Sequence, residues 1–196
     1  MAEIVLYHHA QGLTAGVEAF ASELRQAGHS VHVPDFYEGH TFRTLDEGVA
    51  YLQQTGSGTI RERALAAAEG LSGATVYAGF SLGAMPAQQL AQTRPGAKGA
   101  LLFSSCAPVS EFSDSWPADV PVQIHGMDGD PYFASEDDGD GDLDAARALD
   151  DSTEQAELFL YPGQEHLFAD SSLPSYDQAA ASLLTSRVLN FLAGIR

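Results

Sequence analysis

The segment that most constrains the fold is residues 74–85, ATVYAGFSLGAM, where a strand-like run enters G-x-S-x-G and a helix-prone run follows. In that context the serine occupies a nucleophile elbow, a sharp turn that exposes its hydroxyl. Gly79 and Gly83 suit the turn, because a Cβ at either position would crowd neighbouring backbone. The helix after Ser81 directs N–H groups and its dipole toward the turn, which favours negative charge there. Although three fixed positions in five also match by chance, the flanking strand and helix favour the elbow.

Strand-like and helix-like segments alternate along the whole chain. In residues 14–27, apolar side chains recur at i, i+3, i+4 and i+7, which indicates an amphipathic helix. Strands are expected at 3–7, 29–33, 74–78, 100–104, 120–125 and 157–161, and helices at about 14–27, 45–54, 59–71, 82–93, 143–150 and 176–192. This alternation predicts an α/β fold with a mostly parallel sheet of about six or more strands, flanked by helices on both faces. With no repeat and no linker, one domain over residues 1–196 is expected.

Composition narrows the possible partners and compartment. The net charge is −18, with Lys98 as the only lysine, so nucleic acid and anionic membranes would be repelled. No apolar run approaches the ~20 residues of a membrane span, and the N-terminus has no signal-peptide pattern. The single Cys106 suits a reducing cytoplasm, and we expect it to pack in the core rather than act as a nucleophile. A cytoplasmic protein acting on a small molecule is therefore expected, with its oligomeric state and the reason for its acidity left open.

A serine nucleophile needs a base within hydrogen-bond reach, and that base needs a carboxylate to fix its tautomer. With an elbow, the chain order should be Ser, then Asp or Glu, then His. His166 is the only histidine after both Ser81 and the acidic loop, and it lies between the last strand and the last helix. For the acid, Asp128 and Asp130 both follow the strand that ends near residue 125. We favour Asp130, because Asp128 beside a glycine could cap the turn through its own backbone.

The oxyanion hole should combine the backbone N–H of the residue after the nucleophile with one from the loop after the first strand. These are Leu82 and, counting back from a glycine, Ala10, with Gln11 as the next choice. Two histidines line the same loop. His9 could contact substrate or pack beneath it with equal weight, whereas packing is favoured for His8.

Together these residues resemble the dienelactone hydrolase family of α/β-hydrolases. The resemblance covers nearly the whole chain and depends on four segments, 12–14 (GLT), 34–39 (PDFYEG), 79–83 (GFSLG) and 162–168 (PGQEHLF). It implies a minimal α/β-hydrolase sheet and cleavage of an ester or lactone through an acyl-enzyme. No cofactor is needed for such chemistry.

Three positions depart from what the resemblance implies. The type enzymes carry a cysteine nucleophile where this chain has Ser81. They also have a glutamate where His9 stands, and a substrate-binding arginine where Asp170 stands. His9, Gln11 and Asp170 are therefore possible substrate contacts, and neutral esters are expected to be preferred over anionic ones. A distant arginine such as Arg43 could still hold an anion.

Two other interpretations were weighed. The acidic stretch 136–144 fails an EF-hand at the glycine and glutamate positions, so a solvated loop is favoured and no metal site is expected. A non-catalytic protein of the same fold that binds a ligand or partner is the alternative function. The complete set Ser81, Asp130 and His166 in the required order favours a serine hydrolase of a small neutral carboxylic ester, lactone or thioester.

Overall fold

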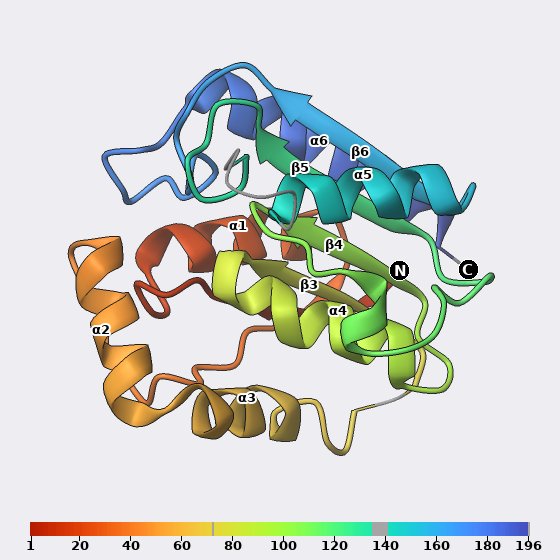
Figure 1. The fold of residues 1–196 in the computed structure, drawn as a ribbon, viewed down its shortest axis with the longest axis horizontal. Coiled ribbons are helices and arrows are strands. Elements are labelled where there is room, and N and C mark those ends of the chain that lie inside the picture. Colours follow the sequence, from red (N-terminus) through yellow and green to blue (C-terminus); the bar gives the residue numbers. More distant parts are fainter. Residues whose placement is uncertain (72, 135–140, 196) are drawn as a thin grey trace.

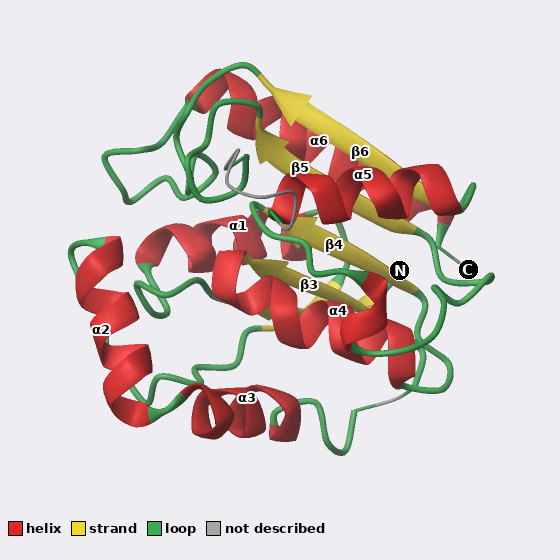
Figure 2. Ribbon diagram, in the orientation of Figure 1, coloured by secondary structure: helices red, strands yellow, loops and turns green. Residues whose placement is uncertain are grey.

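Short apolar and β-branched runs form one parallel sheet in the computed structural model, which describes residues 1–71, 73–134 and 141–195. The strands in chain order are β1 (Glu3–Tyr7), β2 (Ser30–His32), β3 (Thr75–Phe80), β4 (Gly99–Phe103), β5 (Val122–Met127) and β6 (Ala156–Tyr161). Their order across the sheet is β2-β1-β3-β4-β5-β6, and every neighbouring pair is parallel. The predicted α/β class is confirmed, with one sheet through the described residues (Figure 2).

Helices cover both faces of this sheet (Figure 1). They are α1 (Ala15–Gln26), α2 (Leu45–Thr55), α3 (Ser57–Ala66), α4 (Ala84–Thr93), α5 (Asp142–Ser152) and α6 (Gln178–Gly194). Apolar side chains of α1 and α6 pack on one face, while α3, α4 and α5 pack on the other. Side chains of β1 therefore alternate between the two faces. Ile4 packs with α1 and α6, and Val5 packs with the helices of the other face. Helix α2 stands beside the carboxyl ends of the strands, where it can border a site.

Side-chain caps set where several helices begin. The Thr14 hydroxyl accepts a hydrogen bond from the Val17 N–H at the start of α1. Thr44 forms a capping box with Glu47 at the start of α2, and Asp177 caps α6. These caps explain why the predicted helix starts lie within a few residues of the observed ones.

The strand expected at 120–125 lies two residues later, as β5, and two predicted helices differ more clearly in their bounds. The helix expected at 82–93 begins with a 3-10 turn, η1 (Ser81–Gly83), before α4. The helix expected at 59–71 spans Ser57–Ala66 instead. Beyond its end, the Arg94 guanidinium donates to backbone carbonyls, including that of Leu71 at 2.8 Å. Arg94 directly follows α4, so these bonds connect the segment after α3 to the end of α4.

Backbone contact at the elbow makes Gly79 hard to replace. A Cβ on Gly79 would lie 2.0 Å from the Gly83 carbonyl oxygen, so the turn would have to open. We expect Gly79→Ala to lower the free energy of unfolding by roughly 3 kcal/mol or more, measured by urea denaturation. Gly58 on α3 is the matched control, since a Cβ there meets no atom within 4 Å. Gly58→Ala should be neutral or stabilise by up to about 1 kcal/mol, and equal losses in both variants would contradict the argument.

Candidate active site

Ser81 lies in a backbone conformation that non-glycine residues rarely adopt. It directly follows β3, and its φ is 49°, in the left-handed region. Such a conformation costs about 1–3 kcal/mol and persists only where the surroundings enforce it. Two close approaches enforce it. Gly79 lets β3 lie against the Gly83 carbonyl in the first helical turn. Gly83 lets that turn lie against the backbone of Tyr7 and His8 at the end of β1. The hydroxyl is thereby presented at the carboxyl end of the sheet.

Two hydrogen bonds connect Ser81 to a histidine and a carboxylate from later loops. Ser81 Oγ lies 2.7 Å from His166 Nε2, and His166 Nδ1 lies 2.7 Å from Asp130 Oδ2. Asp130 is fully buried, and its other oxygen accepts the Tyr132 N–H at 2.9 Å. Because a carboxylate accepts, Nδ1 carries the proton, which leaves Nε2 free to accept the serine hydroxyl proton. The arrangement can therefore activate Ser81 as a nucleophile.

Asp128, the other aspartate of the β5 loop, has a different environment. Its Oδ1 accepts the Gly163 N–H at 3.2 Å, and its own N–H donates to the Tyr161 carbonyl at 2.9 Å. It therefore connects the loop after β5 to the loop after β6. Of the two aspartates that the sequence offers, the geometry places Asp130 against His166 and Asp128 in the turn.

The loop after β1 is held from several sides. Gln11 donates its backbone N–H to His9 Nδ1 at 3.2 Å, and it exchanges backbone and side-chain hydrogen bonds with Phe42. A Cβ on Gly48 would lie 1.9 Å from the Ala10 carbonyl oxygen, so α2 packs directly on this loop. None of the hydrogen bonds found between described residues uses the Ala10 N–H. On the elbow side, Leu82 lies in the first helical turn, where N–H groups have no intrahelical acceptor.

His9 and Asp170 bind each other below the surface. His9 Nε2 lies 2.8 Å from Asp170 Oδ2, with His9 fully buried and Asp170 2% exposed. Burial raises the pKa of Asp170, but hydrogen bonds from His9, Ser172 and Thr14 outweigh it and lower the pKa to about 2. Both residues were expected as possible substrate contacts, and this geometry gives that expectation no support because their polar atoms face each other.

His8 packs in the core, as favoured from the sequence. Its ring stacks on Phe36 with centroids 3.7 Å apart, and its Nδ1 donates to the His9 carbonyl oxygen. Burial lowers the pKa of His8 to about 4, so the ring is neutral at pH 7. Cys106 is also fully buried, and burial, with Asp142 nearby, raises the pKa of its thiol to about 12. Cys106 is therefore a protonated packing residue.

A cleft of about 210 Å³ opens beside His166. Its lining residues are Gln11, Leu45, Tyr132, Gln164, Glu165, His166, Leu167 and Ser175. Glu165 is the only Asp, Glu, Lys or Arg among these described residues, so the lining offers no cation to an anionic substrate. The Tyr132 ring, 54% exposed, lies 4.9 Å from the His166 ring. Sequence reasoning missed Tyr132, although its place two residues after Asp130 was a usable signal.

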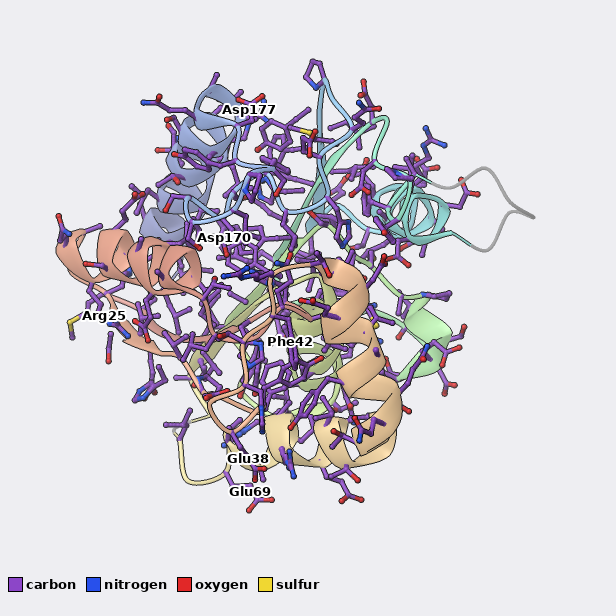
Figure 3. The ribbon with its side chains drawn as sticks, turned by 90° about the vertical axis from the view of Figure 1, so that its left-hand side faces the viewer. Arg25, Glu38, Phe42, Glu69, Asp170 and Asp177 are labelled. Carbon is purple, nitrogen blue, oxygen red and sulfur yellow. The ribbon has the colours of Figure 1, made fainter. Side chains whose placement is uncertain are left out.

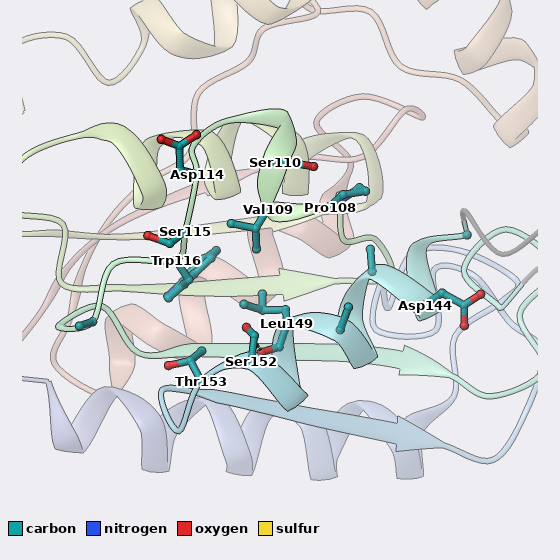
Figure 4. Close-up of a pocket in the computed structure, with 14 residues that line it drawn as sticks. Pro108, Val109, Ser110, Asp114, Ser115, Trp116, Asp144, Leu149, Ser152 and Thr153 are labelled. Carbon is teal, nitrogen blue, oxygen red and sulfur yellow. Dashed lines mark hydrogen bonds between the residues drawn. The ribbon is translucent and has the colours of Figure 1, made fainter.

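Two further pockets lie away from that cleft. A mostly apolar pocket of about 150 Å³ is lined by Leu82 and Met85 from the elbow helix, together with side chains of α2 and α3. A larger one, of about 580 Å³, lies between the loop that holds Trp116 and helix α5 (Figure 4). Its lining includes none of Ser81, His166 and Asp130. Size alone therefore does not identify the candidate site.

The described residues present neither a metal-binding cluster nor a membrane-spanning helix. The calcium alternative for 136–144 falls largely on residues 135–140, which lie outside that set. Within the described ranges, no group of three or more His, Cys, Asp or Glu side chains could hold a metal ion. In the same ranges, every helix is too short or too polar to cross a membrane.

Comparison with known proteins identifies a family and similar folds. The model of the dienelactone hydrolase family matches residues 1–195. A dienelactone hydrolase-like promiscuous phosphotriesterase from metagenomic libraries superimposes with a TM-score of 0.74 at 17% identity. The match covers 100% of this chain and 87% of the phosphotriesterase chain. A cold-adapted esterase from an Arctic intertidal metagenomic library gives 0.65 at 20% identity, covering 100% and 83%. A hydrolase of the α/β superfamily from Xanthomonas campestris gives 0.60 at 23% identity, with both chains fully covered. Among curated protein sequences, none matches this chain.

The different environments of the two aspartates predict different effects of removing their charge. Asp130→Asn should reduce kcat for ester hydrolysis by roughly 10³–10⁴-fold, because an amide favours the wrong tautomer of His166. Asp128→Asn should leave kcat within a few-fold and lower the free energy of unfolding by about 1 kcal/mol, through a weaker bond to Gly163. Steady-state kinetics and urea denaturation of both variants measure this. The reverse ranking in kcat would assign the orienting role to Asp128.

Proposed function

Since the chain belongs to the dienelactone hydrolase family, we propose that it is a serine hydrolase of small carboxylic esters, lactones or thioesters. The observation that carries the proposal is the pair of 2.7 Å contacts from Ser81 through His166 to the buried Asp130. Hydrogen bonds of this length in this order are what a serine needs in order to lose its proton as it attacks a carbonyl.

In the first half of the reaction, Ser81 Oγ attacks the ester carbonyl while His166 Nε2 accepts its proton. Asp130 holds the ring in the correct tautomer and stabilises the imidazolium. The backbone N–H groups of Leu82 and Ala10 donate to the oxyanion that develops on the carbonyl oxygen. His166 then gives the proton to the leaving alcohol or thiol, which departs and leaves an acyl-enzyme.

In the second half, water replaces the alcohol. His166 accepts a proton from water as the oxygen attacks the acyl carbon, and the same two N–H groups bind the second oxyanion. Collapse of this intermediate breaks the bond to Ser81, and His166 returns the proton to Oγ. The acid is released and no cofactor takes part in any step.

The pockets beside Leu82 and His166 favour small, neutral substrates. The mostly apolar pocket of about 150 Å³ adjoins the elbow through Leu82 and Met85, so it suits a short apolar substituent. Arg61, the one charged residue in the described lining of that pocket, donates to the Gln89 side chain at 2.8 Å. The cleft beside His166 has Glu165 as the only Asp, Glu, Lys or Arg among its described lining residues, so an anionic group would lack a partner there. The net charge of −18 repels anions at longer range.

Labelling with a fluorophosphonate tests the nucleophile. We expect the reagent to modify Ser81 of the wild-type protein, and Ser81→Ala to abolish both labelling and ester hydrolysis, with turnover lower by about 10⁴-fold or more. Mass spectrometry of peptides and an ester assay provide the two readouts. Cys106→Ala is the control and should retain activity, because its thiol is buried and protonated. A folded wild-type protein that resists labelling and cleaves no ester would favour the non-catalytic alternative.

The charge of the substrate is a separate prediction. We expect kcat/KM to be at least about tenfold higher for a neutral short-chain ester than for its carboxylate-bearing analogue. The carboxylate of the analogue would have no cationic partner in the cleft. The comparison should be made at low and at high salt, since screening weakens only the long-range repulsion. A preference for the anionic ester at both salt concentrations would refute this substrate class.

A further inference from the structure

We propose that His9 and Asp170 are positioning residues, which hold the loop after β1 so that the Ala10 N–H can bind the oxyanion. The proposal rests on the serine hydrolase function above and assigns a role that the triad does not fill. We refer to residues 8–12 as the oxyanion loop. Neither side chain contacts the substrate in this proposal, because both are buried.

Asp170 is an anchor that connects three segments (Figure 3). Its Oδ2 accepts from His9 Nε2 and from the hydroxyl of Thr14, the residue that caps α1. Its Oδ1 accepts the Ser172 N–H at 2.8 Å and the Ser172 hydroxyl at 2.6 Å. A Cβ on Gly16 would lie 1.7 Å from Oδ1, so only glycine allows the carboxylate this close to the start of α1. The positive end of the α1 dipole favours the negative charge there.

His9 transmits this anchor to the backbone of the oxyanion loop. Because Nε2 donates to the carboxylate, Nδ1 is the unprotonated nitrogen, and it accepts the Gln11 N–H at 3.2 Å. The bond fixes the orientation of the peptide that joins Ala10 to Gln11. From the other side, Gly48 lets α2 pack against the Ala10 carbonyl, and Phe42 binds the backbone of Gln11. With Gln11 engaged, Ala10 provides the N–H available to an oxyanion.

The same turn of the chain carries the anchor and the base. Asp170 donates its N–H to the Leu167 carbonyl at 3.0 Å, which closes a turn directly after His166. One short segment thus places His166 near Ser81 and, through Asp170 and His9, places the oxyanion loop. Displacing this loop by a fraction of an ångström should weaken binding of the transition state, whose oxygen carries charge, more than binding of the neutral ester.

The test compares two variants of the pair with a structural control. Asp170→Asn removes the charge, while His9→Gln retains a donor toward Asp170 but loses the acceptor for the Gln11 N–H. Both should lower kcat by about 10–100-fold with KM changed by less than about threefold. The inhibition constant of a substrate-like trifluoromethyl ketone, which forms an oxyanion with the serine, should rise by the same factor. Asp177→Ala, which removes the cap of α6, should lower the thermal midpoint and leave kcat unchanged.

Three results would overturn the proposal. They are an unchanged kcat in folded His9→Gln, a change confined to KM, or a kcat loss without weaker binding of the ketone. If Asp170→Asn does not fold, His9→Gln decides alone, because it retains a donor toward the carboxylate. Ser81→Ala belongs in the same series. An active Ser81→Ala protein would end the hydrolase proposal itself, whereas an inactive one with unaffected His9 and Asp170 variants would end only the positioning role.

Discussion

The close approach of β3 to the start of the helix that follows it is the constraint on which the candidate site depends. The approach is possible because Gly79 has no Cβ, and the missing Cβ of Gly83 lets the same turn pack on the end of β1, so that Ser81 is held at a φ of 49°. Both ends of the turn are buried in the sheet and in the helix layer, so the surroundings can sustain the strain. The hydroxyl is therefore fixed before any substrate arrives. Every other candidate residue is useful only in so far as it reaches this point.

Three aspartates in the loops after β5 and β6 hold the other candidate residues near the Ser81 hydroxyl. Asp128 connects the two loops through Gly163, Asp130 reaches His166, and Asp170 reaches His9. The last two are buried almost completely, and a buried carboxylate is stable only when N–H or O–H groups satisfy its oxygens. Each of them has such donors, so each is held in a single geometry. A strongly acidic chain thus uses some of its carboxylates as fixed connections between loops.

The proposed oxyanion loop shows how the same edge of the sheet can combine rigidity with an accessible site. Helix α2 packs on the Ala10 carbonyl through Gly48, while His9 supports the loop from beneath. The cleft beside it is bordered by exposed Tyr132 and by Glu165. With a well-supported backbone under an open cleft, the choice of ligand depends on the few residues at the rim.

The elbow, the α/β class and the order of a serine, an aspartate and a histidine could be predicted from the sequence, because each depends on local spacing or on the order of strands. Strand periodicity and helix caps are properties of neighbouring residues. The sequence favoured Asp130 over Asp128 through turn chemistry alone, since both follow the same strand, and only the path of the later loop brings Asp130 to His166 and Asp128 to Gly163.

The contact between His9 and Asp170 could not be predicted from the sequence either, because the two residues are 161 positions apart. In the sequence, each of the two differed from the residue that the family's type enzymes carry at its position, and each was a possible substrate contact. Only the tertiary structure shows that they bind each other, because contacts between distant loops depend on how helices α1 and α6 place those loops around the sheet. By itself the sequence identified the candidate residues, because their types and order are written in it, and the packing of the loops decided which of them meet at the proposed site and which support it from beneath.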